Sequence, residues 1–171
     1  MFANILPVPR RILLLLTVPL WTVPLQAHDN YATEHNAVML DRAQTKFMLS
    51  CGGCHGTLGE SPPLSVPVLR GRAGYFLCTP QGREYVIRLP NVSRALMSDA
   101  DLAAVMNFVT FKLGEHSVPG KAQPFTAAEV AEIRARPLNA LPLNAFRRKV
   151  VKTLVSRCGA PADMLDYGKL H

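Results

Sequence analysis

The sequence predicts a mostly α-helical protein, and three observations carry this prediction. Apolar residues recur at helical spacing before residue 51, a capped amphipathic segment covers residues 98–113, and two further helical segments follow residue 114. The chain has 171 residues, enough for one domain after removal of the leader described below.

The first predicted helix covers residues 35–50. Met39, Ala43 and Phe47 follow one another at intervals of four residues, with Leu40 beside them. This spacing places the four side chains on one apolar face of a helix, which leads directly into the motif described next.

Residues 51–55 read Cys-Gly-Gly-Cys-His, the attachment signature of a c-type haem. The thiols of Cys51 and Cys54 lie one helical turn apart and can add to the two vinyl groups of one haem. His55 then lies beneath the ring, where an imidazole nitrogen can bind the iron as its proximal ligand. The sequence therefore predicts one covalently bound haem c.

The cysteines also permit two other interpretations. A redox dithiol normally follows a strand, whereas the segment before Cys51 has a helical pattern. A structural zinc site would combine Cys51 and Cys54 with Cys78 and Cys158, but zinc gives no reason for a histidine at this spacing.

Residues 1–27 are predicted to be a signal peptide. Arg10 and Arg11 precede an apolar core over residues 12–25, and Ala27 offers a small residue for cleavage. The core is shorter than the roughly 20 residues of a membrane span, although a retained anchor is the alternative. We expect export to the periplasm of a bacterium, where this type of haem is attached, and no membrane span after cleavage.

The charge of the expected mature chain is moderately positive, with 17 basic and 12 acidic residues. The basic residues are scattered, apart from a group over residues 147–152, and no basic stripe is interleaved with aromatics. Nucleic acid is therefore not expected as a partner. A positive face could steer an acidic redox partner, and a merely solvated surface is the alternative.

Cys78 and Cys158 remain once a haem takes the other two cysteines. In an oxidising compartment two such thiols are candidates for a disulfide, which would close a loop of about 80 residues. From the sequence, a disulfide and a pair of free thiols are equally possible.

Residues 56–90 contain five prolines and five glycines. A segment of this length without regular structure is uncommon in a compact domain unless it has a function. We expect an irregular loop that wraps a flat apolar cofactor.

The next predicted helix begins after Ser98, a favoured N-cap residue, with Asp99 in the first turn near the positive end of the helix dipole. Gly114 provides a stop. Apolar residues at helical spacing follow the cap: Leu102, Val105, Met106, Val109 and Leu113.

The remaining residues form a predicted helical extension. Thr126 and Glu129 form a capping box for a short helix, and a longer helix covers residues 145–158 and stops at Gly159. The extension either covers one edge of the haem and the outside of the other helices, or forms a docking surface with outward basic side chains, namely Arg147, Arg148, Lys149 and Lys152.

Residues 31–113 resemble the class I family of single-haem c-type cytochromes. The matching segments are Cys51–Gly56, Val66–Gly71 and Met97–Val109, with an aromatic residue, Phe108, facing the first helix. The resemblance implies a cytochrome c-like haem domain over residues 28–114 with a C-terminal extension over 115–171. It also implies thioether bonds at Cys51 and Cys54, proximal ligation by His55, and electron transfer rather than enzymatic catalysis.

The sixth iron ligand departs from this family. The family usually places a methionine seven to nine residues before the aspartate of the last helix, where this chain has Leu89-Pro90. Met97 is the tentative distal ligand. Met106, His116 and an open position are the alternatives.

The predicted function is one-electron transfer by iron. A periplasmic dehydrogenase is the expected electron donor, and an oxidase or another cytochrome is the expected acceptor. An open sixth position would instead favour a peroxidase-like enzyme or a gas sensor. A third interpretation is a haem subunit docked permanently on a dehydrogenase, which would bury a larger apolar patch.

Overall fold

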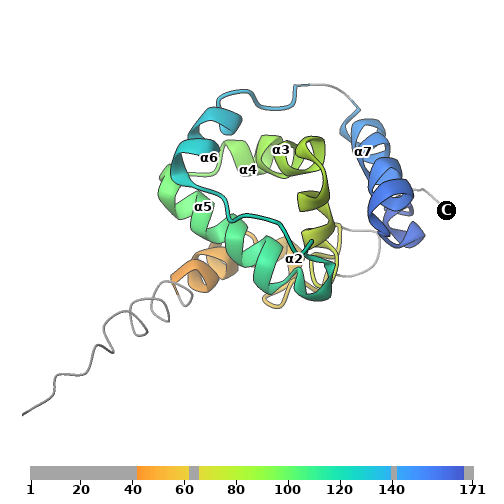
Figure 1. The fold of residues 1–171 in the computed structure, drawn as a ribbon. Coiled ribbons are helices and arrows are strands. Elements are labelled where there is room, and N and C mark those ends of the chain that lie inside the picture. The colour runs from red at the N-terminus through yellow and green to blue at the C-terminus, as the bar shows by residue number, and fades with distance from the viewer. Residues whose placement is uncertain (1–41, 62–65, 140–141, 168–171) are drawn as a thin grey trace, which may run out of the picture. The chain divides into compact units, whose positions relative to one another are not determined.

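The computed structural model describes residues 42–61, 66–139 and 142–167 (Figure 1). These residues contain helices and no strand, so the predicted mostly α-helical fold is confirmed. The predicted signal peptide, residues 1–27, lies outside the described residues. No helix in the described part of the chain combines the length and apolar character needed to cross a bilayer.

Residues 42–50 are helical, and ten labelled elements follow them along the described chain. These are α2 (Gly52–His55), η1 (Ala73–Cys78), α3 (Pro80–Arg88), α4 (Pro90–Ser93), α5 (Asp99–Asn107), η2 (Phe108–Lys112), η3 (Glu115–Ser117), α6 (Ala127–Arg134), α7 (Leu143–Cys158) and η4 (Ala162–Leu165).

The first helix packs against α5 and η2 through one apolar cluster. The rings of Phe47 and Phe108 lie 5.4 Å apart between centroids, with Ala43 and Val105 buried beside them. An ion pair of 3.0 Å between Lys46 and Asp101 crosses the edge of this contact. The expected packing of Phe108 against the first helix is therefore present.

The predicted start of α5 is confirmed by its cap. The side chain of Ser98 accepts a hydrogen bond of 3.1 Å from the backbone N–H of Asp101. After Asn107 the helix widens into the π-helical segment η2, and the buried hydroxyl of Thr110 donates to the carbonyl oxygen of Met106 at 2.8 Å.

The expectation of an irregular loop over residues 56–90 is wrong in its second half, where η1 and α3 form. Pro80 stands at the first turn of α3, where its missing N–H costs no hydrogen bond. Thr79 caps the helix by accepting from Gly82 N–H at 3.0 Å. The prolines and glycines here therefore start a helix and permit its close packing, rather than prevent it.

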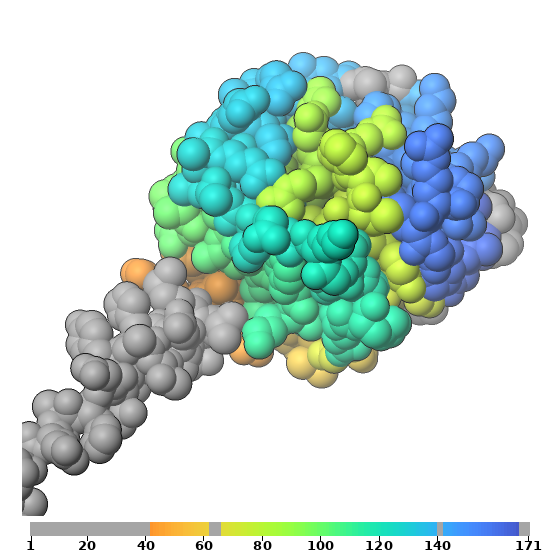
Figure 2. All heavy atoms as spheres, viewed as in Figure 1, coloured from red at the N-terminus to blue at the C-terminus, as the bar shows by residue number. Residues whose placement is uncertain are grey.

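The C-terminal extension shares a core with the preceding helices. Thr126 caps α6 as predicted, and Gly159 ends α7 with a φ of 67°. One cluster of buried side chains combines residues of η1, α3 and α5 with others from α6 and α7. In Figure 2 the blue C-terminal segment lies directly against the yellow-green segment that contains α3.

Arg83 of α3 joins the start of α6 to this core. Its guanidinium donates to both carboxylate oxygens of Glu129, at 2.5 and 2.7 Å, and lies 4.0 Å from the ring centroid of Phe125. The hydrogen bonds from Arg83 hold the pKa of the Glu129 carboxyl below its ordinary value. The segment that enters the extension is thus fixed by charge as well as by packing.

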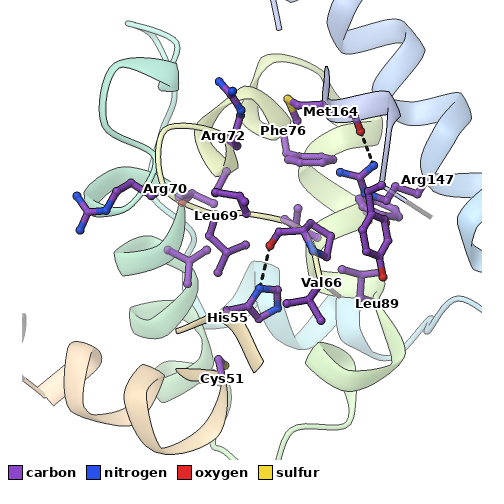
Figure 3. A pocket seen from close by; sticks show the side chains of 18 of the residues that line it. Cys51, His55, Val66, Leu69, Arg70, Arg72, Phe76, Leu89, Arg147 and Met164 are labelled. Carbon is purple, nitrogen blue, oxygen red and sulfur yellow. Dashed lines mark hydrogen bonds between the residues drawn. The ribbon is translucent and has the colours of Figure 1, made fainter. Parts of the chain in front are cut away.

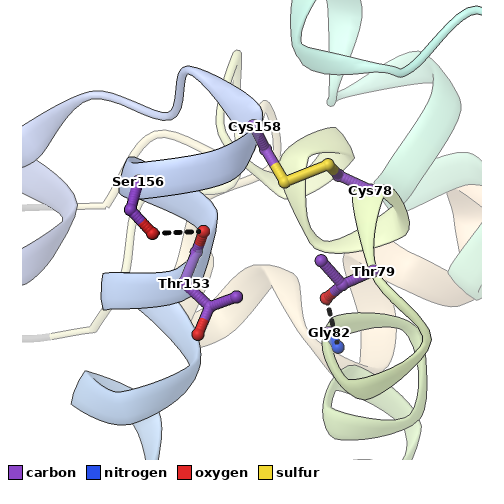
Figure 4. Close-up of a disulfide and its surroundings, with 6 residues drawn as sticks. All are labelled: Cys78, Thr79, Gly82, Thr153, Ser156 and Cys158. Carbon is purple, nitrogen blue, oxygen red and sulfur yellow. Dashed lines mark hydrogen bonds between the residues drawn. A yellow bond between two sulfur atoms is a disulfide. The ribbon is translucent and has the colours of Figure 1, made fainter.

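A disulfide between Cys78 and Cys158 joins the end of η1 to the end of α7 (Figure 4). Their Cα atoms lie 6.2 Å apart, and 80 residues of sequence separate them. The bond thereby ties the last long helix of the extension to the segment that precedes α3.

We expect the double substitution of Cys78 and Cys158 by alanine to lower the free energy of unfolding by about 4 kcal/mol, because the cross-link restricts the unfolded chain. Urea unfolding of the purified protein followed by circular dichroism measures this difference. An unchanged unfolding midpoint would contradict a stabilising role for the disulfide.

Candidate haem-binding site

The Cys-x-x-Cys-His motif continues the first helix. Cys51 N–H donates to the carbonyl oxygen of Phe47 at 2.8 Å, and His55 N–H donates to that of Cys51 at 3.0 Å. The first helix is anchored by the Phe47–Phe108 contact, so the motif has a fixed support. The three side chains expected to bind haem therefore come from one short, rigid turn.

Gly56 ends α2 and turns the chain away from the motif. Its φ of 73° and ψ of 154° are open to glycine alone, and a Cβ atom here would stand 2.6 Å from the carbonyl oxygen of Glu60. The backbone after His55 therefore depends on a glycine.

The imidazole of His55 is held in one orientation and one tautomer. Its Nδ1–H donates to the carbonyl oxygen of Pro67 at 3.0 Å (Figure 3). Since a carbonyl can only accept, Nδ1 carries the proton and Nε2 keeps its lone pair. Burial lowers the pKa of His55 below its ordinary value, and the hydrogen bond to Pro67 opposes this only in part. The ring is thus kept neutral, the form that binds a metal.

The two cysteines of the motif are free thiols. Cys51 is half-buried and lines a cavity beside His55, whereas Cys54 is exposed. Burial, together with the neighbouring Cys54, raises the pKa of the Cys51 thiol. Both sulfur atoms remain available for covalent attachment.

The cavity next to the motif has a volume of about 750 Å³, within the range of pockets that hold small molecules and cofactors. Figure 3 shows its interior, with His55 and Cys51 on one side. Most of its wall is apolar, and representative lining residues are Val66, Leu69, Phe76, Leu89, Val92 and Val109. A flat apolar group with one edge at Cys51 would meet a mostly apolar wall here.

The candidate distal ligands differ in whether they line the cavity. Met106 and His116 line the cavity, whereas Met97 is absent from its lining and packs against the two hydrophobic clusters. Arg134 of α6 donates to the carbonyl oxygen of Met97 at 3.0 Å and fixes the backbone there. The position of Met97 favours a packing role ahead of α5 over a role as iron ligand.

Several residues of the extension line the cavity, including Leu143, Arg147, Met164 and Tyr167. This placement agrees with the interpretation in which the extension covers a haem edge. The alternative of four outward basic side chains is wrong for Arg147, which is 7% exposed, while Lys149 and Lys152 are exposed. The reason is helical geometry, because Arg147 shares the buried face of α7.

A zinc site made of the four cysteines is not possible, because Cys78 and Cys158 are bonded to each other. What remains is a pair of free thiols, a neutral imidazole with its Nε2 lone pair free, and an apolar cavity. This set fits a haem that is attached through two thioethers and bound by one histidine, which is the arrangement of a c-type cytochrome.

Comparisons with known proteins point to the same class. The chain is 29% identical over 123 residues to cytochrome c-552 of Thermus thermophilus, an alignment that covers 61% of this chain and 94% of that protein. A second cytochrome c-552, from a designated strain of the same species, is also 29% identical over 123 residues and is covered to 83%. No protein-family model and no solved structure matches the chain. The similarity supports a c-type cytochrome and is consistent with a cytochrome c-like helical fold.

We expect Gly56→Ala to destabilise the protein by about 1–3 kcal/mol, because it forces a side chain into a backbone conformation reserved for glycine. Gly53→Ala is the matched control, since a Cβ atom there meets nothing within 4 Å and the residue is helical. Urea unfolding of both variants measures the difference. Equal stability of the two would contradict the role given to Gly56.

We expect Met97→Ala to leave the visible spectrum of the loaded protein unchanged and to lower its stability by about 1–2 kcal/mol, since a partly buried side chain is lost from two clusters. Spectra of the ferric and ferrous protein, with thermal unfolding, test this. A shifted ferric spectrum would show that the Met97 sulfur does bind iron.

Proposed function

We propose that this protein is a periplasmic, class I-type cytochrome c that carries single electrons on one covalently bound haem. Cys51 and Cys54 would hold the haem, and His55 would bind its iron from the proximal side. The observation that carries the proposal is the hydrogen bond from His55 Nδ1 to Pro67, which leaves Nε2 free at a cavity that also contains the Cys51 thiol.

The haem would supply the redox chemistry, with iron alternating between its ferric and ferrous states. The protein would contribute the remaining requirements. The thiols would fix the position of the ring, and the imidazole would ligate the iron in an orientation fixed by Pro67. The apolar wall would exclude water, which lowers the dielectric constant around the iron and helps set its potential.

Covalent attachment would let one edge of the ring stay accessible without loss of the cofactor. Cys54 is exposed, so the attachment edge would lie near the surface of the described part of the protein. A periplasmic dehydrogenase is the proposed electron donor, and an oxidase or a second cytochrome is the proposed acceptor. Such partners form small, charge-steered and transient contacts.

The experiment that tests the function is a visible absorption spectrum of the protein matured with the haem-attachment machinery, taken oxidised, reduced, and reduced with carbon monoxide. Sharp reduced bands that carbon monoxide does not move are the result expected of an electron carrier. Absence of a Soret band would refute the haem, and a ready shift with carbon monoxide would favour the enzyme or sensor.

The attachment itself has a direct test. Replacing both Cys51 and Cys54 by alanine should abolish haem staining of the denatured protein on a gel, because no thioether can form. The matched control replaces Cys78 and Cys158, which removes the same number of sulfur atoms but should leave the staining intact. Staining of the first variant would disprove attachment at the motif.

A further inference from the structure

Arg147 of α7 stands in the wall of the cavity in an unusual state for a charged residue. Only 7% of its surface is exposed, and burial lowers the pKa of its guanidinium below the ordinary value. Its Nη1 donates to the carbonyl oxygen of Met164 at 2.7 Å, and its guanidinium carbon lies 5.0 Å from the ring centroid of Tyr167. Figure 3 draws this hydrogen bond at the cavity.

Two other arginines line the same cavity, and both are paired with carboxylates. Arg70 contacts Glu60 at 3.0 Å and also Glu115, and Arg72 contacts Asp163 at 2.8 Å. The side chains of Arg70 and Arg72 are 33% and 30% exposed, so water also solvates their charges. Both guanidinium groups are thus compensated within the described structure.

Arg147 differs from these two in its partners. None of the ion pairs between described residues includes it, and the titratable groups that act on it are the phenols of Tyr85 and Tyr167. Burial raises the pKa of Tyr85 to about 12, so this phenol is neutral at physiological pH. The carbonyl oxygen of Met164 and the neutral phenol of Tyr85 do not balance a positive charge.

An uncompensated buried charge is destabilising, and an occupant of the cavity would remove Arg147 still further from water. A guanidinium offers five N–H donors, of which one is used in the hydrogen bonds between described residues. The remaining donors suit a carboxylate, which can accept two of them in parallel. The site therefore calls for an apolar occupant that carries an anionic group.

We propose that Arg147 binds a propionate carboxylate of the haem, so that the C-terminal extension forms part of the cofactor site. This proposal rests on the proposed function. The two propionates of a haem stand on the edge of the ring opposite the vinyl groups. Thioether bonds at the motif would therefore direct the carboxylates away from the cysteines, and Figure 3 shows Cys51 and Arg147 on opposite sides of the cavity.

This contact has an electrostatic consequence for the iron. A propionate left unpaired in a low-dielectric site stabilises the ferric state, because that state carries the additional positive charge. Arg147 neutralises the carboxylate and thereby favours the ferrous state. The extension would therefore raise the midpoint potential as well as close the cavity.

The test compares Arg147→Gln with Arg148→Gln in haem-loaded protein. Arg148 is the next residue of α7 and is not among the cavity-lining residues, so the control removes the same charge without touching the cofactor. We expect the midpoint potential of Arg147→Gln to fall below that of the control, and its propionate bending mode in the resonance Raman spectrum to shift. The control should match the wild-type protein in both measurements.

Equal potentials and unshifted propionate modes in the two variants, with haem attached to both, would overturn the role of Arg147 and leave the proposed function intact. A wild-type protein without covalent haem would overturn both proposals. If Arg147→Gln does not accumulate, Arg147→Lys replaces it, since lysine keeps the charge but not the paired donors. We expect Arg147→Lys to shift the propionate mode but to keep a midpoint potential close to that of the wild-type protein. An unshifted mode would contradict the proposal.

Discussion

The rest of the site depends on the hydrogen bond between His55 and Pro67. It selects the tautomer of the imidazole, and it joins the motif helix to a segment twelve residues further along the chain. That segment is itself fixed, because Gly59 accepts backbone hydrogen bonds from Leu69 and Arg70, and Gly71 donates to Leu113 at the end of η2. Through the carbonyl oxygen of Pro67, the helical core thus holds His55 Nε2, the atom proposed to bind iron, in a fixed position.

Local sequence signals predicted most of the helices because each signal acts within a few residues. Ser98 and Thr126 cap their helices through their own side chains, and Gly159 stops α7 through its backbone. The error over residues 56–90 has a physical reason. Proline and glycine usually interrupt helices, whereas Pro80 occupies the one part of a helix that accepts it, and Gly82 packs against the backbone of Phe76.

The candidate site was predictable where its chemistry is contiguous in sequence and not where it is assembled from distant segments. Cys51, Cys54 and His55 form one turn, so five consecutive residues are enough to propose them as the haem-binding group. Arg147 lies within a run of basic residues, yet its spacing to Val150, Val151 and Leu154 places it on the same helical face as these fully buried residues. That periodicity was a usable signal, whereas the apolar cavity that Arg147 meets depends on tertiary packing.

The disulfide between Cys78 and Cys158 joins two parts of the cavity wall, which bears on how a cofactor would enter. It clamps α7, which carries one section of the cavity wall, to η1, which carries another. A chain oxidised before it receives its cofactor must admit a rigid planar group of haem size between walls that are already joined. A chain that receives the cofactor first can close around it and then be oxidised. If the protein binds haem as proposed, the timing of thiol oxidation relative to haem attachment would decide whether the cofactor enters an open or an already cross-linked cavity.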